Sequence, residues 1–369
     1  MRLLQKECGK CLRHPFLWIV CITFGLFQFL SIYTYVGNAG MRKELRQMHM
    51  AVTDEETASP EYESAYADYK KTYGGMYDTL DMRKILEQKE KKSGYEPQGV
   101  WGSWIVRNYD RLQKRVEQIR KTGEGTYAFY PGSWYKLHTT LYGKLWKKLI
   151  LQTAVLMILS MLYLMDYERI YKTQDLVLTT TTGKKMMEKK MLAGALCGLF
   201  YAGLLTVFTL LVFFAAVPFQ NLWHVPVAAC MVAEPRLQMM YPFVTFWRLE
   251  QWRYFLLALV VLVGLLGIIA VVTAAVQLFL QNSYFSFAVL GLLFMGAYLL
   301  AYVQMGNVWD LIRELFNPTV LYATSGGWFM ENDLCLSFAG NEFAVLFCSG
   351  TAAVCLMAVG KRRYHRLEV

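Results

Sequence analysis

The chain has 369 residues, of which 55% are hydrophobic and 18% are charged. A soluble globular domain carries about 25% charged residues, so this chain is short of soluble surface. Charged residues are absent from 191–233 and from 254–309, and a bilayer-spanning helix needs roughly 20 consecutive apolar residues. The composition excludes a soluble enzyme, a disordered chain and a small disulfide scaffold, and it predicts an all-α integral membrane protein.

The net charge of +10 comes from basic residues that are spread along the chain. It therefore does not indicate a nucleic-acid partner. Eight cysteines are present, and none lies in the hydrophilic segment 37–146, which excludes a disulfide framework there. Cys230 and Cys335 fall in two loops on the same predicted side, where they either pair or serve as small apolar residues.

Residues 1–14 carry four basic side chains on one side at helical spacing. This pattern fits either an interfacial helix that lies on anionic membrane lipid or a basic tail that fixes orientation. Residues 15–36 form the first predicted span, with no charged residue. This apolar core is longer than the roughly 7–15 residues of a signal peptide, so we expect an uncleaved anchor.

Residues 37–146 form a hydrophilic insert with 18 Lys or Arg and 15 Asp or Glu. Ser59-Pro60-Glu61 is a helix start, and a second helix is predicted from about Trp104 to Thr122, with Gly123 ending it. A row of tyrosines at spacings of three and four follows the first start, and it is either an external ligand face or a helix-packing seam. The five tyrosines are Tyr62, Tyr66, Tyr69, Tyr73 and Tyr77.

Five further spans follow, and all nine prolines lie outside the span interiors. The predicted spans are 147–165, 191–217, 254–280, 284–303 and 343–360. The segments 166–190 and 361–369 and the amino tail together hold 14 Lys or Arg, whereas the loops 218–253 and 304–342 hold 4. The positive-inside rule then predicts a plasma-membrane protein with both termini cytoplasmic and the insert extracellular.

No catalytic, cofactor or metal site is predicted. Gly183-Lys184 is the nearest approach to a phosphate-binding loop, but Leu178 stands where its first glycine belongs. The five histidines show no metal-ligand spacing. Apart from Lys147 and Lys148 at the entrance of the second span, the predicted spans contain no Asp, Glu, Lys or Arg, which argues against a proton relay or an intramembrane hydrolase.

Residues 166–190 contain a charged helix, a short apolar run, a hydroxyl-rich turn and a basic helix. Taken alone they fit a simple connecting loop, although an apolar run at a membrane surface usually needs a cover. The stretch resembles the coupling region of type-2 ABC-transporter permeases, with Thr181 at the usual turn proline and Lys172 near the usual glycine. The matching residues are Glu168-Arg169, Asp175-Leu176-Val177-Leu178, Thr180 and Lys184. The six spans, the amino-terminal helix and the short link after the fourth span are similar to that family as well.

The resemblance implies the permease subunit of a bacterial ABC exporter that moves a hydrophobic or amphipathic substrate, such as a peptide, drug or lipid-like molecule. It implies two partners, a cytoplasmic ATP-binding ABC subunit and a second permease copy or paralogue. The implied contacts to the ATPase are Glu168, Asp175, Thr180, Gly183 and Lys184. The alternative is a non-transporting membrane receptor or immunity protein whose insert binds an external ligand. A membrane enzyme is the third hypothesis, and no acid–base or nucleophile constellation supports it.

Overall fold

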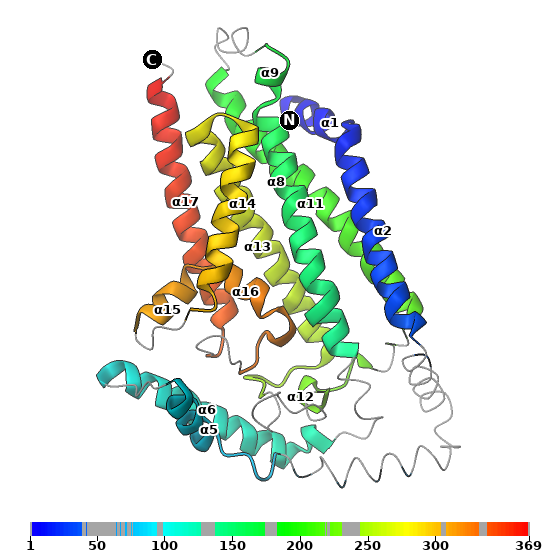
Figure 1. The fold of residues 1–369 in the computed structure, drawn as a ribbon, viewed down its shortest axis with the longest axis vertical. Coiled ribbons are helices and arrows are strands. Elements are labelled where there is room, and N and C mark those ends of the chain that lie inside the picture. The colour runs from blue at the N-terminus through cyan, green and yellow to red at the C-terminus, as the bar shows by residue number, and fades with distance from the viewer. Residues whose placement is uncertain are drawn as a thin grey trace.

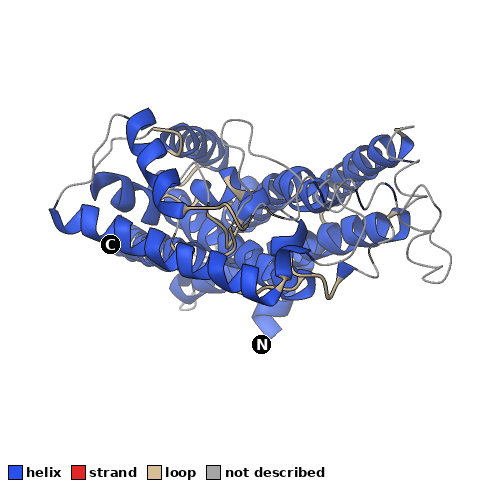
Figure 2. Cartoon of the chain, turned by 90° about the horizontal axis from the view of Figure 1, so that it is seen from below, coloured by secondary structure: helices blue, strands red, loops and turns tan. Residues whose placement is uncertain are grey.

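The computed structural model describes residues 2–38, 42, 64, 67, 71, 75, 77–93, 99–126, 137–173, 183–217, 219, 222–230, 244–303, 308–331 and 338–367. These residues are predominantly helical, and they contain no strand (Figure 2). Their extended pairing is limited to two isolated bridges, Pro226 with Glu250 and Thr245 with Met330. The predicted all-α class is confirmed for this part of the chain.

Six helices of the described chain are long and apolar enough to cross a bilayer (Figure 1), as the sequence predicts. The second of them continues a π-helix, η2 (Thr139–Leu145). The six are α2 (Pro15–Gly37), α8 (Trp146–Met165), α11 (Gly183–Ala216), α13 (Gln251–Leu280), α14 (Ser283–Leu300) and α17 (Asn341–Leu367).

Two of these helices run well past the predicted spans. Helix α11 begins at Gly183 rather than at 191, and α17 continues to Leu367 rather than ending at Gly360. In both cases the added turns are basic. Lysine and arginine are good helix formers, so the helix continues where the apolar stretch has stopped.

The tightest helix contacts run through glycines. A Cβ atom at Gly194 would lie 3.1 Å from the Cα atom of Met161, and one at Gly198 would lie 3.1 Å from the Cα atom of Met157. The two glycines are four residues apart on α11 and so face α8 together. Helix α14, by contrast, buries only two of its residues, Ser286 and Leu290.

Both chain termini lie at one end of the bundle, together with the short helix α1 (Arg2–Leu12), and we call this the terminal end (Figure 1). Helices α5 (Met82–Ser93) and α6 (Gly99–Thr122) lie across the opposite end, which we call the insert end. Helix α6 ends where the sequence predicts, and Gly123 follows in the left-handed region at φ 67°.

The insert helices share a small core with the loops between α11 and α13. Buried apolar residues of α5 and α6 pack there against Ala228, in α12 (Val227–Cys230), and against Val244. The insert helices therefore lie directly on the bundle. The segment between α14 and α17, predicted as a loop, contains α15 (Val308–Leu315), α16 (Thr319–Ala323) and the 3-10 turn η4 (Ser325–Gly327).

Candidate functional site

A cluster of buried charges lies at the terminal end, where α8 gives way to the short helix α9 (Tyr167–Ile170). Its centre is Glu168, which is 6% exposed. The Glu168 carboxylate pairs with Lys190 of α11 and, at 3.4 Å, with Lys10 of α1. Lys190 is also buried. Charged side chains are almost never buried unless they are paired, so this cluster depends on its pairing.

Helix α1 contributes a second carboxylate to the cluster. Lys10 Nζ lies 2.6 Å from Glu7 Oε1, and Glu7 is buried. The same ammonium group lies 4.4 Å from the centroid of the Tyr167 ring, where the ring quadrupole attracts a cation. We call Glu7, Lys10, Glu168 and Lys190 the charge junction.

Helix α1 is also fixed to α11 by uncharged contacts. The Tyr201 hydroxyl donates to the Cys11 carbonyl at 3.4 Å, and the Cys197 thiol lies 3.8 Å from the Cys8 carbonyl. Burial, with Cys197 beside it, raises the pKa of Cys8 to about 11. A raised pKa keeps a thiol protonated and unreactive, so the Cys8-x-x-Cys11 spacing belongs to the packed face of α1.

Asp166, the residue directly after α8, makes hydrogen bonds to a further span, α14. Ser283, the first residue of α14, donates from its hydroxyl to Asp166 Oδ2 at 2.8 Å and from its backbone at 3.3 Å. Asn282 caps the same helix by accepting from two backbone N–H groups, at 3.0 and 3.2 Å. The segment 166–170 is therefore tied to α1, α11 and α14 at once.

This arrangement is suited to transmitting movement. A displacement of α9 strains the Glu168 pairs and the Asp166–Ser283 hydrogen bond, and breaking a buried pair costs about 3–5 kcal/mol. Three helices must therefore follow α9 or exchange partners. Within the described residues no group of three His, Cys, Asp or Glu side chains can hold a metal ion.

The structure describes two of the five implied ATPase contacts. Glu168 is buried within the chain, and Gly183 is the first residue of α11. Asp175, Thr180 and the side chain of Lys184 lie outside the described residues. The buried, internally paired state of Glu168 differs from the exposed contact that the resemblance implies. The two basic partners that cause this burial are remote from Glu168 in sequence.

One residue of the predicted tyrosine row is described. Tyr77 lies in a turn, is 6% exposed and donates from its hydroxyl to the Ala228 carbonyl at 3.1 Å. This placement matches the packing alternative for Tyr77 rather than an external ligand face. The other four, Tyr62, Tyr66, Tyr69 and Tyr73, lie outside the described residues.

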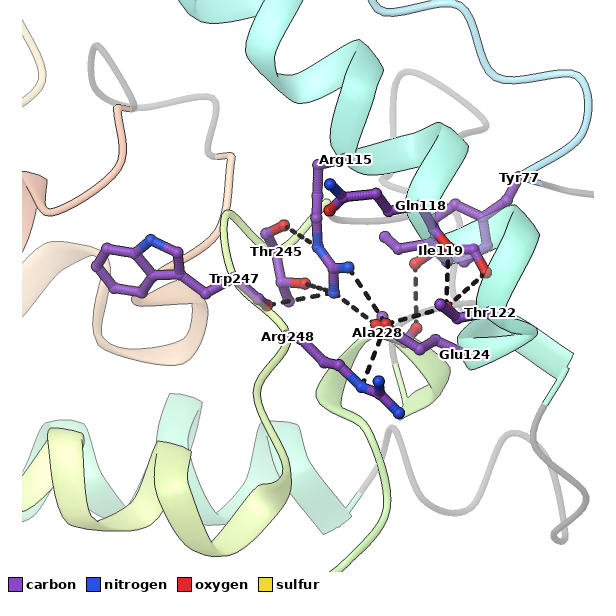
Figure 3. A network of polar contacts seen from close by, with 10 residues as sticks. All are labelled: Tyr77, Arg115, Gln118, Ile119, Thr122, Glu124, Ala228, Thr245, Trp247 and Arg248. Atoms are coloured by element: carbon purple, nitrogen blue, oxygen red, sulfur yellow. Dashed lines mark hydrogen bonds and ion pairs between the residues drawn. The ribbon is translucent and has the colours of Figure 1, made fainter.

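A second buried charge network fixes the insert to the bundle (Figure 3). The Arg115 guanidinium donates to both carboxylate oxygens of Glu124, at 3.2 and 2.5 Å. It also donates to the carbonyls of Thr245 and Trp247, at 3.2 and 3.3 Å. Arg248 approaches Glu124 from the other side at 3.6 Å. We call these five residues the insert clamp.

A buried histidine lies at the same end, just before η2. His138 Nδ1 is 3.3 Å from the amide of Gln251, whose Nε2 donates to Cys230 Sγ at 3.1 Å. Burial lowers the pKa of His138 to about 4, although the hydrogen bond to Gln251 opposes the shift. Cys230 is a free thiol, and Cys335 lies outside the described residues.

Sequence patterns missed the partners in both networks. The helical spacing of residues 1–14 predicts Lys10 on a basic face, the positive-inside count includes Lys190, and no pattern identifies Arg115. The sequence contains only a weak signal for these buried pairs. Lys190 directly precedes an apolar stretch, where a charge is either at the interface or paired.

The comparisons with known proteins leave the family open. No protein-family model, no curated protein and no solved structure matches this chain.

Proposed function

We propose that the chain is the membrane-spanning subunit of an ABC-type exporter, driven by a separate cytoplasmic ATPase subunit and working with a second permease copy or paralogue. The support is its architecture. The amphipathic helix α1, the short helix α9 and both termini lie at one end of a six-helix bundle, and the insert helices lie at the other (Figure 1). In this proposal the terminal end is cytoplasmic, in the plasma membrane, and the insert is extracellular.

The charge junction is the observation on which this proposal depends. An ATPase can move the spans only if the segment it touches is mechanically tied to them. Glu168 makes that tie to α1 and α11, and Asp166 makes it to α14. A passive loop needs neither buried pair.

Glu168 therefore has a changed role in the proposal. It positions the coupling segment instead of touching the ATPase, because its carboxylate is buried against two lysines of its own chain. The contacts to the ATPase are then Asp175, Thr180, Gly183 and Lys184. The insert receives or recognises the exported hydrophobic or amphipathic substrate, and Tyr77 anchors the insert instead of binding that substrate.

The test is co-purification of an ATPase with the full chain, comparing Asp175→Lys with Glu87→Lys. Both substitutions reverse an acidic charge, and Glu87 is exposed on α5 at the insert end. We expect Asp175→Lys to weaken the ATPase complex about 5- to 150-fold, the range for loss of an interface contact worth 1–3 kcal/mol, and Glu87→Lys to leave it intact. Equal retention in both variants would contradict the coupling role. If the wild-type chain recruits no ATPase, the receptor or immunity alternative replaces the exporter.

A further inference from the structure

Helix α15, between the last two spans, has its polarity inverted relative to a surface helix of a soluble protein. Its charged residues face the protein: Asp310 is 6% exposed, Glu314 is 2% exposed and the Arg313 side chain is 10% exposed. Arg313 pairs with Asp310 at 3.5 Å and with Glu314 at 3.3 Å. An apolar face points away from the protein; it consists of Val308, Trp309 and Ile312 of α15 and of Phe316, the residue directly after the helix.

In water, this arrangement of exposed apolar and buried charged side chains would be unfavourable. Trp309 is 60% exposed and Phe316 is 54% exposed, and burying a large apolar side chain is worth about 1.5–3 kcal/mol. Burying charges is costly as well. Both preferences reverse if the medium around α15 is hydrocarbon, because the apolar face then has a matching solvent and the charges pair inside the protein.

A hydrogen bond places the carboxyl-terminal end of α15 inside the length of the span α17. Ser349 Oγ donates to the carbonyl of Leu315, the last residue of α15, at 3.1 Å. Ser349 is eight residues after the start of α17, which is about 12 Å along that helix. Figure 1 shows α15 and α16 beside the ends of α14 and α17 that lie toward the insert.

The polar groups of the irregular link after α15 make hydrogen bonds within the protein. Polar groups at membrane depth need such internal partners. Asn317 is 7% exposed, and its side chain donates to the Ala297 carbonyl of α14 at 2.8 Å. The same side chain accepts from the hydroxyl and the backbone of Thr319, at 2.6 and 3.2 Å. Non-helical backbone is tolerated in a bilayer only where it is buried in protein, and this link meets that condition.

The outer face of α15 continues the exposed apolar surfaces of its neighbours. Helix α14 exposes Leu299 and Leu300 near its end, and α17 exposes Phe343 and Phe347 near its start. These two helices are bilayer-spanning by length and composition, so their exposed apolar surface faces lipid.

We propose that α15 is a re-entrant helix whose Val308–Trp309–Ile312–Phe316 face contacts the acyl chains of the leaflet at the insert end, while Asp310, Arg313 and Glu314 form a charge group held inside the membrane. The occupant of the apolar face is lipid, and the proposal does not depend on the exporter assignment. It moves part of the predicted external loop 304–342 into the bilayer. It also places three charged residues at membrane depth in a protein whose predicted span interiors have no Asp, Glu, Lys or Arg, and such residues are usually functional.

Tryptophan quenching in lipid nanodiscs tests this proposal with the full chain. Emission is compared between wild type and Trp309→Phe, in phosphatidylcholine with and without bromine on the acyl chains, and with acrylamide in the water. Trp18→Phe in the span α2 serves as the lipid-facing control, since Trp18 is 37% exposed. Trp328→Phe serves as the buried control, since Trp328 is 0% exposed.

We expect the emission that is lost in Trp309→Phe to be the part that brominated lipid quenches and acrylamide does not, as for Trp18. The Trp328 component should resist both quenchers. Quenching of the Trp309 component by acrylamide alone would place α15 in water and overturn the proposal. Resistance of that component to both quenchers would mean that protein, such as a second copy of this chain, covers the face, and would also overturn it.

Discussion

The charge junction and the insert clamp both bury a carboxylate between two basic side chains, yet their geometry differs. In the clamp, Arg115 reaches both oxygens of Glu124 and two backbone carbonyls. In the junction, Lys10 and Lys190 meet Glu168 as single ammonium groups. A guanidinium fork fixes direction as well as distance, whereas an ammonium group is a point charge on a flexible stem.

This difference indicates how the two ends behave. The clamp has one satisfied arrangement, so it holds the insert rigidly on the bundle. The junction has two carboxylates, Glu7 and Glu168, within reach of Lys10, so the ammonium group can exchange between them. The terminal end is therefore suited to movement, and the insert end is suited to support.

The largest expected effect comes from breaking the clamp. Arg115→Leu leaves Glu124, 3% exposed, with only the exposed Arg248 as a cationic partner and the Thr122 hydroxyl as a hydrogen-bond donor, and removing one partner of a buried pair costs about 3–5 kcal/mol. The insert should then become sensitive to protease at lower temperature. Arg248→Leu is the control, because the Arg248 side chain is 69% exposed and such a surface pair is worth about 0–1 kcal/mol. Equal protease sensitivity in the two variants would show that the clamp does not hold the insert.

Acid should weaken the insert end next. Burial lowers the pKa of His138 to about 4 in the folded chain from its ordinary value of 6.5, so below pH 6.5 the unfolded chain binds the additional proton. Stability should fall as the pH drops from 6.5 to 4 and then level off, by about 3 kcal/mol in total. The groups around the imidazole are Gln251, Tyr142 and Tyr254.

The measurement is thermal unfolding between pH 4 and pH 7 for wild type, His138→Asn and His224→Asn. His138→Asn should lose most of the acid sensitivity that wild type shows over this range. The side chain of His224 is 85% exposed, and its replacement should leave that sensitivity in place. An unchanged pH profile in His138→Asn would assign the sensitivity to other groups.

A smaller effect is expected from neutralising the junction. Glu168→Gln keeps the size of the side chain and an oxygen that still accepts from a lysine, and Lys10 keeps Glu7 as its partner. The cost should therefore fall below that of a fully broken buried pair, and we expect a loss of about 1.5–3 kcal/mol, the value of hydrogen bonds to charged groups. Helix α1 should loosen, and maleimide labelling of Cys11, 0% exposed, should accelerate. The control is Glu188→Gln, whose side chain is 64% exposed and pairs with Lys361. Faster Cys11 labelling in Glu188→Gln than in Glu168→Gln would contradict the junction.

The smallest expected effect tests directly whether guanidinium geometry separates the insert clamp from the charge junction. Lys10→Arg keeps the charge of a partly exposed side chain, and we expect a stability change within about 0.5 kcal/mol. Arg115→Lys loses the fork and its carbonyl contacts, so it should cost clearly more in the same thermal assay. If both exchanges cost the same, guanidinium geometry is not what separates the two ends.

The sequence by itself determined the features that depend on local physics. The six apolar helices follow from stretches of sufficient length without charge. The end of α6 follows from Gly123, because glycine adopts a positive φ without steric cost. Neither feature needs a distant neighbour, so neither required the tertiary structure.

Tertiary structure alone decided where the charges of both networks and of α15 lie. Glu168 reads as a surface acid, and its burial depends on Lys10, which is 158 residues away in sequence. Asp310, Arg313 and Glu314 read as ordinary loop charges, and only their packing against neighbouring helices turns them inward. Hydropathy patterns assign every charge to water, whereas a folded chain can bury a charge wherever it supplies a partner. That partner comes from a contact between remote segments, which no local pattern contains.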